Sequence, residues 1–182
     1  VFSLAFSGVQ VMFVPFLDDV FGYDASQAAL LLTYVGALGA LNQGILVGRL
    51  ARRFSEARLA VVGALSFLCS IAALPFTPEI GRTLFSGVPG PAFLTPGLIA
   101  MLVVLTGLSV GNGLLSVSLT ALVSATASDR TQGTAFGLTQ GAGSLGRTVG
   151  PPAMAALYAV VAYWSPFVAG AVLVVPILWI AV

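Results

Sequence analysis

Residues 132–152 read QGTAFGLTQGAGSLGRTVGPP, and the interpretation of the whole chain starts from this stretch. It predicts most of a membrane-spanning helix with one charge, Arg147, near its middle. At 3.6 residues per turn, its small and polar residues share about 120° of arc. They are Gly133, Gly137, Gln140, Gly141, Ser144, Arg147, Thr148 and Pro151. One face of the predicted helix is therefore small and polar, with a cation on it.

The spacing of the glycines and prolines adds two expectations. Gly133, Gly137 and Gly141 form overlapping GxxxG steps, which let helix backbones approach closely in lipid. Pro151 and Pro152 remove two amide donors and predict a kink just after Arg147.

A charged residue such as Arg147 needs a compensating contact inside a membrane-spanning helix. An Arg at bilayer depth costs roughly 2.5–3.5 kcal/mol on insertion scales, so it faces a partner, a water-filled cavity or a ligand. Two readings stay open. Arg147 lines a transport cavity, or it is a structural residue tied to carbonyls or to a gate outside this chain.

Composition places the chain in a membrane. It is 58% hydrophobic and 7% charged with a mean hydropathy of +1.06, against about 25% charged residues in soluble proteins.

A net charge of +1 argues against a nucleic-acid partner. With one cysteine, Cys69, and no histidine, we expect no internal disulfide, no metal site and no cofactor. The chain starts inside an apolar segment at Val1, so we expect it to be part of a longer protein.

Six apolar stretches are long enough to cross a ~30 Å hydrocarbon core, which takes about 20 residues. They run roughly over 2–20, 26–48, 58–76, 97–124, 133–161 and 164–182. They are too long for strands and lack a period of two, so the expected fold class is an all-α, multi-pass membrane protein. The connection 77–96, rich in Pro and Gly, predicts an irregular outer loop with a short turn near 80–85.

Arginines orient the predicted spans. Arg49, Arg52, Arg53 and Arg58 lie in one connection and Arg130 in another, against Arg82 alone on the opposite side. The positive-inside rule then places both ends of this segment in the cytoplasm.

Polar positions within the spans are the candidate substrate-cavity residues. They are Ser7 and Gln10 in the first span, Gln43 in the second, Ser109, Asn112 and Ser116 in the fourth, and Gln140, Ser144 and Arg147 in the fifth. Such polar stripes either hold helices together through close packing and hydrogen bonds or line a water-filled pathway. The third and sixth spans are plain apolar helices and are predicted to be peripheral.

An acidic pair, Asp18 and Asp19, lies at the outer end of the first span, just after Pro15. It is either a solvated helix end or a candidate proton or cation site at the outer mouth. No span carries an acid at mid-membrane, so a proton-carrying carboxylate is expected outside this chain unless one of this pair serves.

Two short stretches match enzyme motifs but lack the surrounding features that those motifs require. GLSVG at 107–111 matches a nucleophile elbow but lies inside a predicted membrane helix, in a chain without histidine. GAGSLG at 141–146 matches a dinucleotide fingerprint but follows no strand. We therefore expect that this chain is not an enzyme.

Spans one to three and four to six follow the same scheme: polar-striped, polar and Gly-rich, then plain apolar. Two such triplets of opposite orientation are typical of an inverted repeat in a transporter.

Two stretches carry a family resemblance. GRLARRFSEARL at 48–59 resembles the short cytoplasmic loop, roughly G-x-L-A-D-R-x-G-R-R, of major facilitator superfamily transporters. Gly48, Leu50, Ala51 and Arg53 match, whereas Arg52 stands where the pattern has Asp, and Ser55 and Glu56 depart from its Gly-Arg. Residues 129–151 resemble the stretch that enters helix eleven in the drug:proton antiporter branch, which includes tetracycline-resistance-like carriers.

The resemblance implies the C-terminal half of a twelve-helix carrier, whose spans one, two, four and five line a central cavity. It also implies a cytoplasmic gating loop at Gly48, Arg49, Arg52 and Arg53. The expected function is secondary transport of a small organic solute, most simply proton-coupled efflux of a drug or metabolite. The expected partners are that solute, the proton, the missing N-terminal half and membrane lipid. The alternatives are an organic-anion symporter or exchanger using Arg147, and a scaffold module that transports nothing.

Overall fold

The computed structural model describes residues 1–182 apart from 88–90, 92–93, 129 and 182. The omitted residues belong to the predicted 77–96 loop, to the connection before residue 132 and to the end of the last predicted span. Within the described residues the chain is helical and contains no strand, which confirms the all-α prediction.

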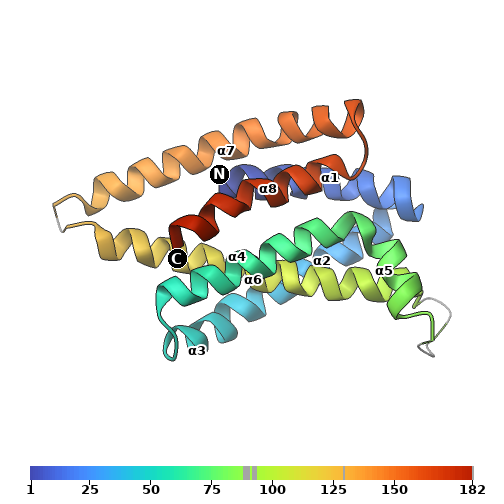
Figure 1. Cartoon of the computed structure of the whole chain (residues 1–182), viewed down its shortest axis with the longest axis horizontal. Helices are drawn as coiled ribbons and strands as arrows, with labels where there is room; N and C mark the ends of the chain where they lie inside the picture. The colour runs from blue at the N-terminus through green and yellow to red at the C-terminus, as the bar shows by residue number, and fades with distance from the viewer. Residues whose placement is uncertain (88–90, 92–93, 129, 182) are drawn as a thin grey trace.

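Six long helical units run side by side along the long axis of the molecule (Figure 1). The described units are α1 (Phe2–Phe21), α2 (Ala25–Leu41) with its continuation through η1 (Asn42–Leu46) and α3 (Val47–Ala51), α4 (Glu56–Ala73) with η2 (Leu74–Phe76) and α5 (Thr77–Leu84), α6 (Pro96–Thr126), α7 (Gln132–Val160) and α8 (Ser165–Ala181). The segment η1 is π-helical and η2 is a 3-10 turn.

A tight turn reverses the chain between α1 and α2. Gly22 ends α1 in the left-handed conformation, with φ of 64°, which favours glycine. Asp24 then caps α2: the Gln27 amide donates to its carboxylate at 2.8 Å, and the Asp24 amide donates to the Gln27 side chain at 3.0 Å.

Four helical units of the described chain are long and apolar enough to cross a membrane: 2–21, 25–51, 56–84 and 96–126. The shorter stretch 165–179 is also apolar. These units indicate an integral, multi-pass membrane protein. The helix α7 is not among the four because Gly, Ser, Thr, Gln and Arg147 lower its hydropathy, so the prediction of six apolar spans is supported only in part.

The core lies where α1, α4, α6 and α8 meet. Its largest side chains, each less than 2% exposed, include Phe16, Phe67, Phe167, Ile71 and Met101. The Phe16 and Phe167 rings pack edge to face with centroids 5.1 Å apart. The helices α4 and α8, predicted to be peripheral, each bury one face in this core and leave the other exposed, as at Val62 and Val172.

Glycines bring α4 and α6 almost into backbone contact. A Cβ added to Gly111 would lie 2.5 Å from the Phe67 amide nitrogen, and one added to Gly63 would lie 2.7 Å from that of Leu115. The Ser66 hydroxyl bridges the same seam by donating to the Gly107 carbonyl at 2.8 Å. No side chain larger than hydrogen fits at these two glycines without moving a helix.

The GxxxG face of α7 makes no such contact. Added Cβ atoms at Gly133, Gly137 and Gly141 would meet nothing within 4 Å in the described structure. Instead α7 packs on α1 through later glycines: a Cβ at Gly150 would lie 2.6 Å from the Leu4 carbonyl oxygen, and one at Gly146 3.0 Å from the Leu4 amide. The GxxxG face in the first half of α7 thus stands clear of its neighbours, and the helix continues through both prolines to Val160.

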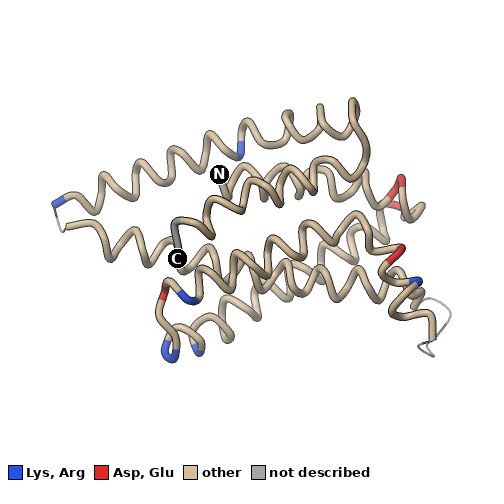
Figure 2. Tube along the Cα trace, in the orientation of Figure 1, with Lys and Arg blue, Asp and Glu red and all other residues tan. Residues whose placement is uncertain are grey.

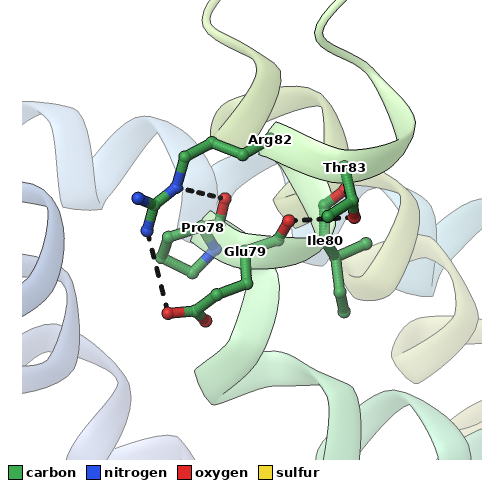
Figure 3. Close-up of polar contacts among 5 residues, drawn as sticks. All are labelled: Pro78, Glu79, Ile80, Arg82 and Thr83. Carbon is green, nitrogen blue, oxygen red and sulfur yellow. Dashed lines mark hydrogen bonds and ion pairs between the residues drawn. The ribbon is translucent and has the colours of Figure 1, made fainter.

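Part of the predicted 77–96 loop is instead the helix α5. Pro78 lies in its first turn, where a missing amide donor costs nothing. Figure 3 shows its local contacts: Arg82 Nε donates to the Pro78 carbonyl at 3.4 Å and Nη2 lies 3.7 Å from Glu79 Oε1. Gly81 packs directly against the start of α6, which holds α5 on the bundle.

Charged residues gather at the two ends of the bundle (Figure 2). The end formed by the α3–α4 connection carries Arg49, Arg52, Arg53 and Arg58, and the opposite end carries Asp18, Asp19 and Asp24. Arg147 is the exception, because it lies within α7.

Candidate functional site

Polar residues of three helices surround a hollow of about 270 Å³ between α1, α6 and α7, named here the small hollow. Its lining residues are Phe2, Ser3, Phe6, Ser7, Gln10, Asn112, Ser116 and Arg147. Ser7, Gln10, Asn112, Ser116 and Arg147 are sequence-predicted cavity residues from three separate spans. The fold brings them together.

A second hollow of about 630 Å³, the large hollow, adjoins the first. The two share Phe2, Ser3, Ser116 and Arg147 as lining residues. The large hollow adds predicted Gln140, together with Thr120 and Thr139. It opens where the first half of α7 stands clear of α6.

Arg147 lies at the boundary between the two hollows and is exposed. Its Nη2 donates to the Ser144 hydroxyl, one turn earlier on α7, at 3.1 Å. This bond uses one of the five N–H donors of the guanidinium. Among the described residues the one recorded ion pair is Arg82–Glu79, so no described carboxylate neutralises Arg147.

Ser7 forms the floor of the small hollow and also ties two helices together. It is buried, and its hydroxyl lies within hydrogen-bond distance of the Leu4 carbonyl, at 3.3 Å, and the Gly146 carbonyl, at 3.4 Å. Ser7 can reach the second of these because α1 and α7 meet at glycines. Its role in this structure is therefore mainly to join α1 to α7.

Ser109, Gln43 and Ser144 line neither hollow, although all three were predicted to do so. Ser109 is buried and accepts a hydrogen bond from Asn42 Nδ2 at 3.1 Å, inside the contact between η1 and α6. Gln43, the next residue of η1, is exposed. The second span thus contributes no lining residue to the two hollows.

The residues of the predicted gating loop, Gly48, Arg49, Arg52 and Arg53, are all exposed at the end of α3. The turn there is closed by backbone bonds: the Arg53 and Phe54 amides donate to the Leu50 carbonyl at 2.9 and 3.0 Å. The loop lies at the end of the bundle and lines neither hollow.

The acidic pair at the end of α1 is exposed, and the structure gives one of its members a partner. The Tyr158 hydroxyl, on α7, donates to Asp19 Oδ2. Asp18 contributes its backbone carbonyl to the Gly22 turn. Sequence reasoning missed Tyr158, because 139 residues separate it from Asp19 and no local pattern links them.

Chemically, the two hollows offer hydroxyls, amides and one cation beside the rings of Phe2 and Phe6. Such a lining can hold a partly apolar solute through its polar or anionic group. No acidic side chain lines either hollow, and the described residues contain no group of three or more metal ligands. Ser3, Thr120 and Thr139 also line the hollows although they were not candidates; Ser3 shares a helical face with Ser7 and Gln10, and that periodicity was the signal for it.

Comparison with known proteins gives a partial sequence match. The chain is 34% identical over 148 residues to Solute carrier family 22 member 18 of Mus musculus, and 35% identical over 148 residues to the protein of that name in Rattus norvegicus. The match covers 81% of this chain and 32% of each relative, so the chain spans about a third of the length of the curated relatives it matches. No family model and no solved structure matches it. The sequence is therefore similar to part of two proteins named as solute carriers.

Proposed function

We propose that this chain is the C-terminal six-helix half of a major-facilitator carrier that moves a small organic solute across a membrane. The observation that carries the proposal is the small hollow, where Gln10, Asn112, Ser116 and Arg147 converge from α1, α6 and α7. Polar groups of this kind are expensive in a bilayer unless they face water or a ligand. The similarity to curated solute carriers supports the same assignment.

In this proposal the chain is built from two inverted three-helix repeats, with both ends of the segment in the cytoplasm. The missing N-terminal half covers the open side of the hollows and rocks against this half around the solute. The exposed GxxxG face of α7 supports that arrangement, because Gly133, Gly137 and Gly141 have free space over them for a closely approaching helix.

Proton-coupled efflux, as in the drug:proton antiporter branch, is the first form of the proposal. Because neither hollow has an acidic lining residue, the proton-carrying carboxylate belongs to the partner half in this form, unless Asp18 or Asp19 serves. The Tyr158–Asp19 bond favours the partner half, since it gives Asp19 a role in holding α7 to α1.

Symport or exchange of an organic anion is the second form, and one observation favours it. Arg147 is the cation of both hollows and has no carboxylate within salt-bridge distance among the described residues. An anionic group of the solute would neutralise it in place.

Transport by the full-length protein in proteoliposomes tests the proposal, with a panel of labelled organic anions, cations and neutral amphiphiles. We expect Arg147→Gln to abolish flux of the transported compound while the variant inserts and unfolds like the wild type. Arg147→Lys should retain part of the flux if transport requires the positive charge of Arg147 and not its guanidinium group. The matched control is Arg82→Gln, which removes an exposed arginine at the end of the bundle away from the hollows.

The results of this assay distinguish the antiporter, the exchanger and the scaffold module. Flux that responds to an imposed proton gradient supports the antiporter, whereas flux driven by an opposing organic anion supports the exchanger. A scaffold module predicts no flux of any panel member, and Arg147→Gln would then impair only folding or assembly.

A further inference from the structure

A third hollow, of about 490 Å³, lies at the arginine-rich end of the bundle, between α3, the start of α4 and α6. We name it the basic-end hollow. Its lining residues are Leu50, Phe54, Ala57, Arg58, Leu59, Val61, Val62 and Leu114. The volume lies within the range of small-molecule sites, yet Arg58 is the sole polar side chain in the lining.

The floor of the basic-end hollow is a hydrophobic cluster separate from the main core. Leu59 and Leu114 are buried there together with Val47. The rim is open: Phe54 is 46% exposed and Val62 is 54% exposed. An apolar surface is therefore accessible from outside the bundle at the level where the membrane-spanning units end.

Positive charge lies at the same end of the bundle, and one of the arginines, Arg58, lines the hollow. Arg49, Arg52, Arg53 and Arg58 are all exposed within ten residues of sequence, and the one acid among them is Glu56. The described residues of this end contain no ion pair. The amino end of the 18-residue helix α4 also lies here, and its dipole adds to the attraction for an anion.

We propose that the basic-end hollow binds an anionic phospholipid. The acyl chain lies against Leu59, Leu114 and Val62, and the phosphate is held by Arg58 and the neighbouring arginines. An apolar hollow beside a basic cluster at the end of membrane-spanning helices has both parts that such an amphiphile requires.

The shape of the site argues for a lipid over a soluble anion. A free phosphate or a small carboxylate would use the arginines but leave the apolar floor empty. A zwitterionic lipid of equal chain length would fill the floor but would bring no net charge to the four arginines. The proposal does not depend on transport, because it concerns a surface away from both polar hollows.

Native mass spectrometry of the purified full-length protein in detergent tests the proposal. The probes are phosphatidylglycerol and phosphatidylcholine with identical acyl chains. We expect the wild type to retain phosphatidylglycerol in preference, and Arg53→Gln/Arg58→Gln to lose that preference by about fivefold or more for each arginine that holds the phosphate. Arg58→Lys should keep most of it.

A second variant tests the apolar half of the site. Ala57→Trp places a ring in the hollow from an exposed position on the first turn of α4, so both lipids should bind more weakly. Arg82→Gln is the matched control, because it removes an exposed arginine from another end of the bundle and should leave lipid binding unchanged. Size-exclusion profiles and thermal unfolding check that each variant is folded.

Three results would overturn the proposal. They are equal retention of the two lipids by the wild type, an undiminished preference in Arg53→Gln/Arg58→Gln, and displacement of phosphatidylglycerol by inorganic phosphate combined with unchanged binding in Ala57→Trp. The last result would assign the arginines to a soluble anion.

Discussion

Asn42 Nδ2 donates a hydrogen bond to Ser109 Oγ at 3.1 Å, and both side chains are buried, at 8% and 5% exposed. The pair joins the π-helical segment η1 to the middle of α6. A π-helical turn carries an extra residue in the helix and is often found at functional sites. Asn42 therefore fixes the one irregular point of the second helical unit against its neighbour.

The first prediction concerns this pair. Asn42→Ala and Ser109→Ala should each lower the thermal stability of the protein, because each leaves a buried polar group without its partner. The double variant should lose less than the sum, with a coupling free energy of about 0.6 kcal/mol and at most about 1.7 kcal/mol, the average and the maximum from double-mutant cycles on interhelical hydrogen bonds in a membrane protein. Unfolding in detergent measures the cycle. Additive losses would mean that the two residues act separately.

The second prediction concerns the seam between α4 and α6. Gly111→Ala should lower the free energy of unfolding by about 1–3 kcal/mol, because the new Cβ would meet the Phe67 backbone, which has no room to move. Gly36→Ala is the control, since nothing lies within 4 Å of a Cβ added there. Unfolding of the two variants in the same detergent gives the comparison. Equal stability of the two would show that α4 and α6 are farther apart than described.

The third prediction concerns the contact between Tyr158 and Asp19. Tyr158→Phe and Asp19→Ala should each reduce stability modestly, by about 0.5–1.5 kcal/mol, and the double variant should lose no more than either one. Asp18→Asn should have no effect on stability, since only the backbone of Asp18 is engaged. Thermal unfolding checks this set. A proton site at the acidic pair would instead appear as loss of proton-coupled flux in Asp18→Asn, with stability unchanged.

The fourth prediction concerns Ser116, which lines both polar hollows. Ser116→Trp should fill the space between them and abolish solute flux, whereas Ser116→Ala should leave most of it. The readout is uptake into proteoliposomes, normalised to inserted protein. Thr33→Trp is the control, because Thr33 is exposed on α2 and lines none of the three hollows described above. Unaltered uptake by Ser116→Trp would place the solute path elsewhere.

Helix content followed from the sequence because it depends on local properties, namely apolar length and a period of 3.6. Gln140 and Arg147, which share a helical face by their spacing, both line the large hollow, but Ser144 of the same face does not. Helix-to-helix pairing has no local signal. For this reason Asn112 and Ser116 line a hollow while Ser109, on the same predicted stripe, is buried against Asn42.

Glycine and proline were harder to interpret, since one residue type serves several purposes. The overlapping GxxxG steps of α7 predicted close packing, yet the close contact falls on Gly146 and Gly150. A GxxxG motif shows where a helix can approach but does not identify its partner. Likewise the sequence predicts a loop at Pro78, although proline is well suited to the first turn of a helix such as α5.

Because α7 contacts α1 closely at Gly146 and Gly150, a tilt of α7 would turn about this contact. At about 1.5 Å per residue, the arm from Gly146 to Gln132 is roughly 21 Å long, so a tilt of about 10° at the glycines displaces Gln132 by roughly 4 Å. Gln132 Nε2 donates to the Ser124 hydroxyl at 2.8 Å, so the end of α6 travels with it. An added carbon at Gly146 should therefore shift Thr139 and Gln140, which line the large hollow, while Arg147, next to the point of contact, hardly moves.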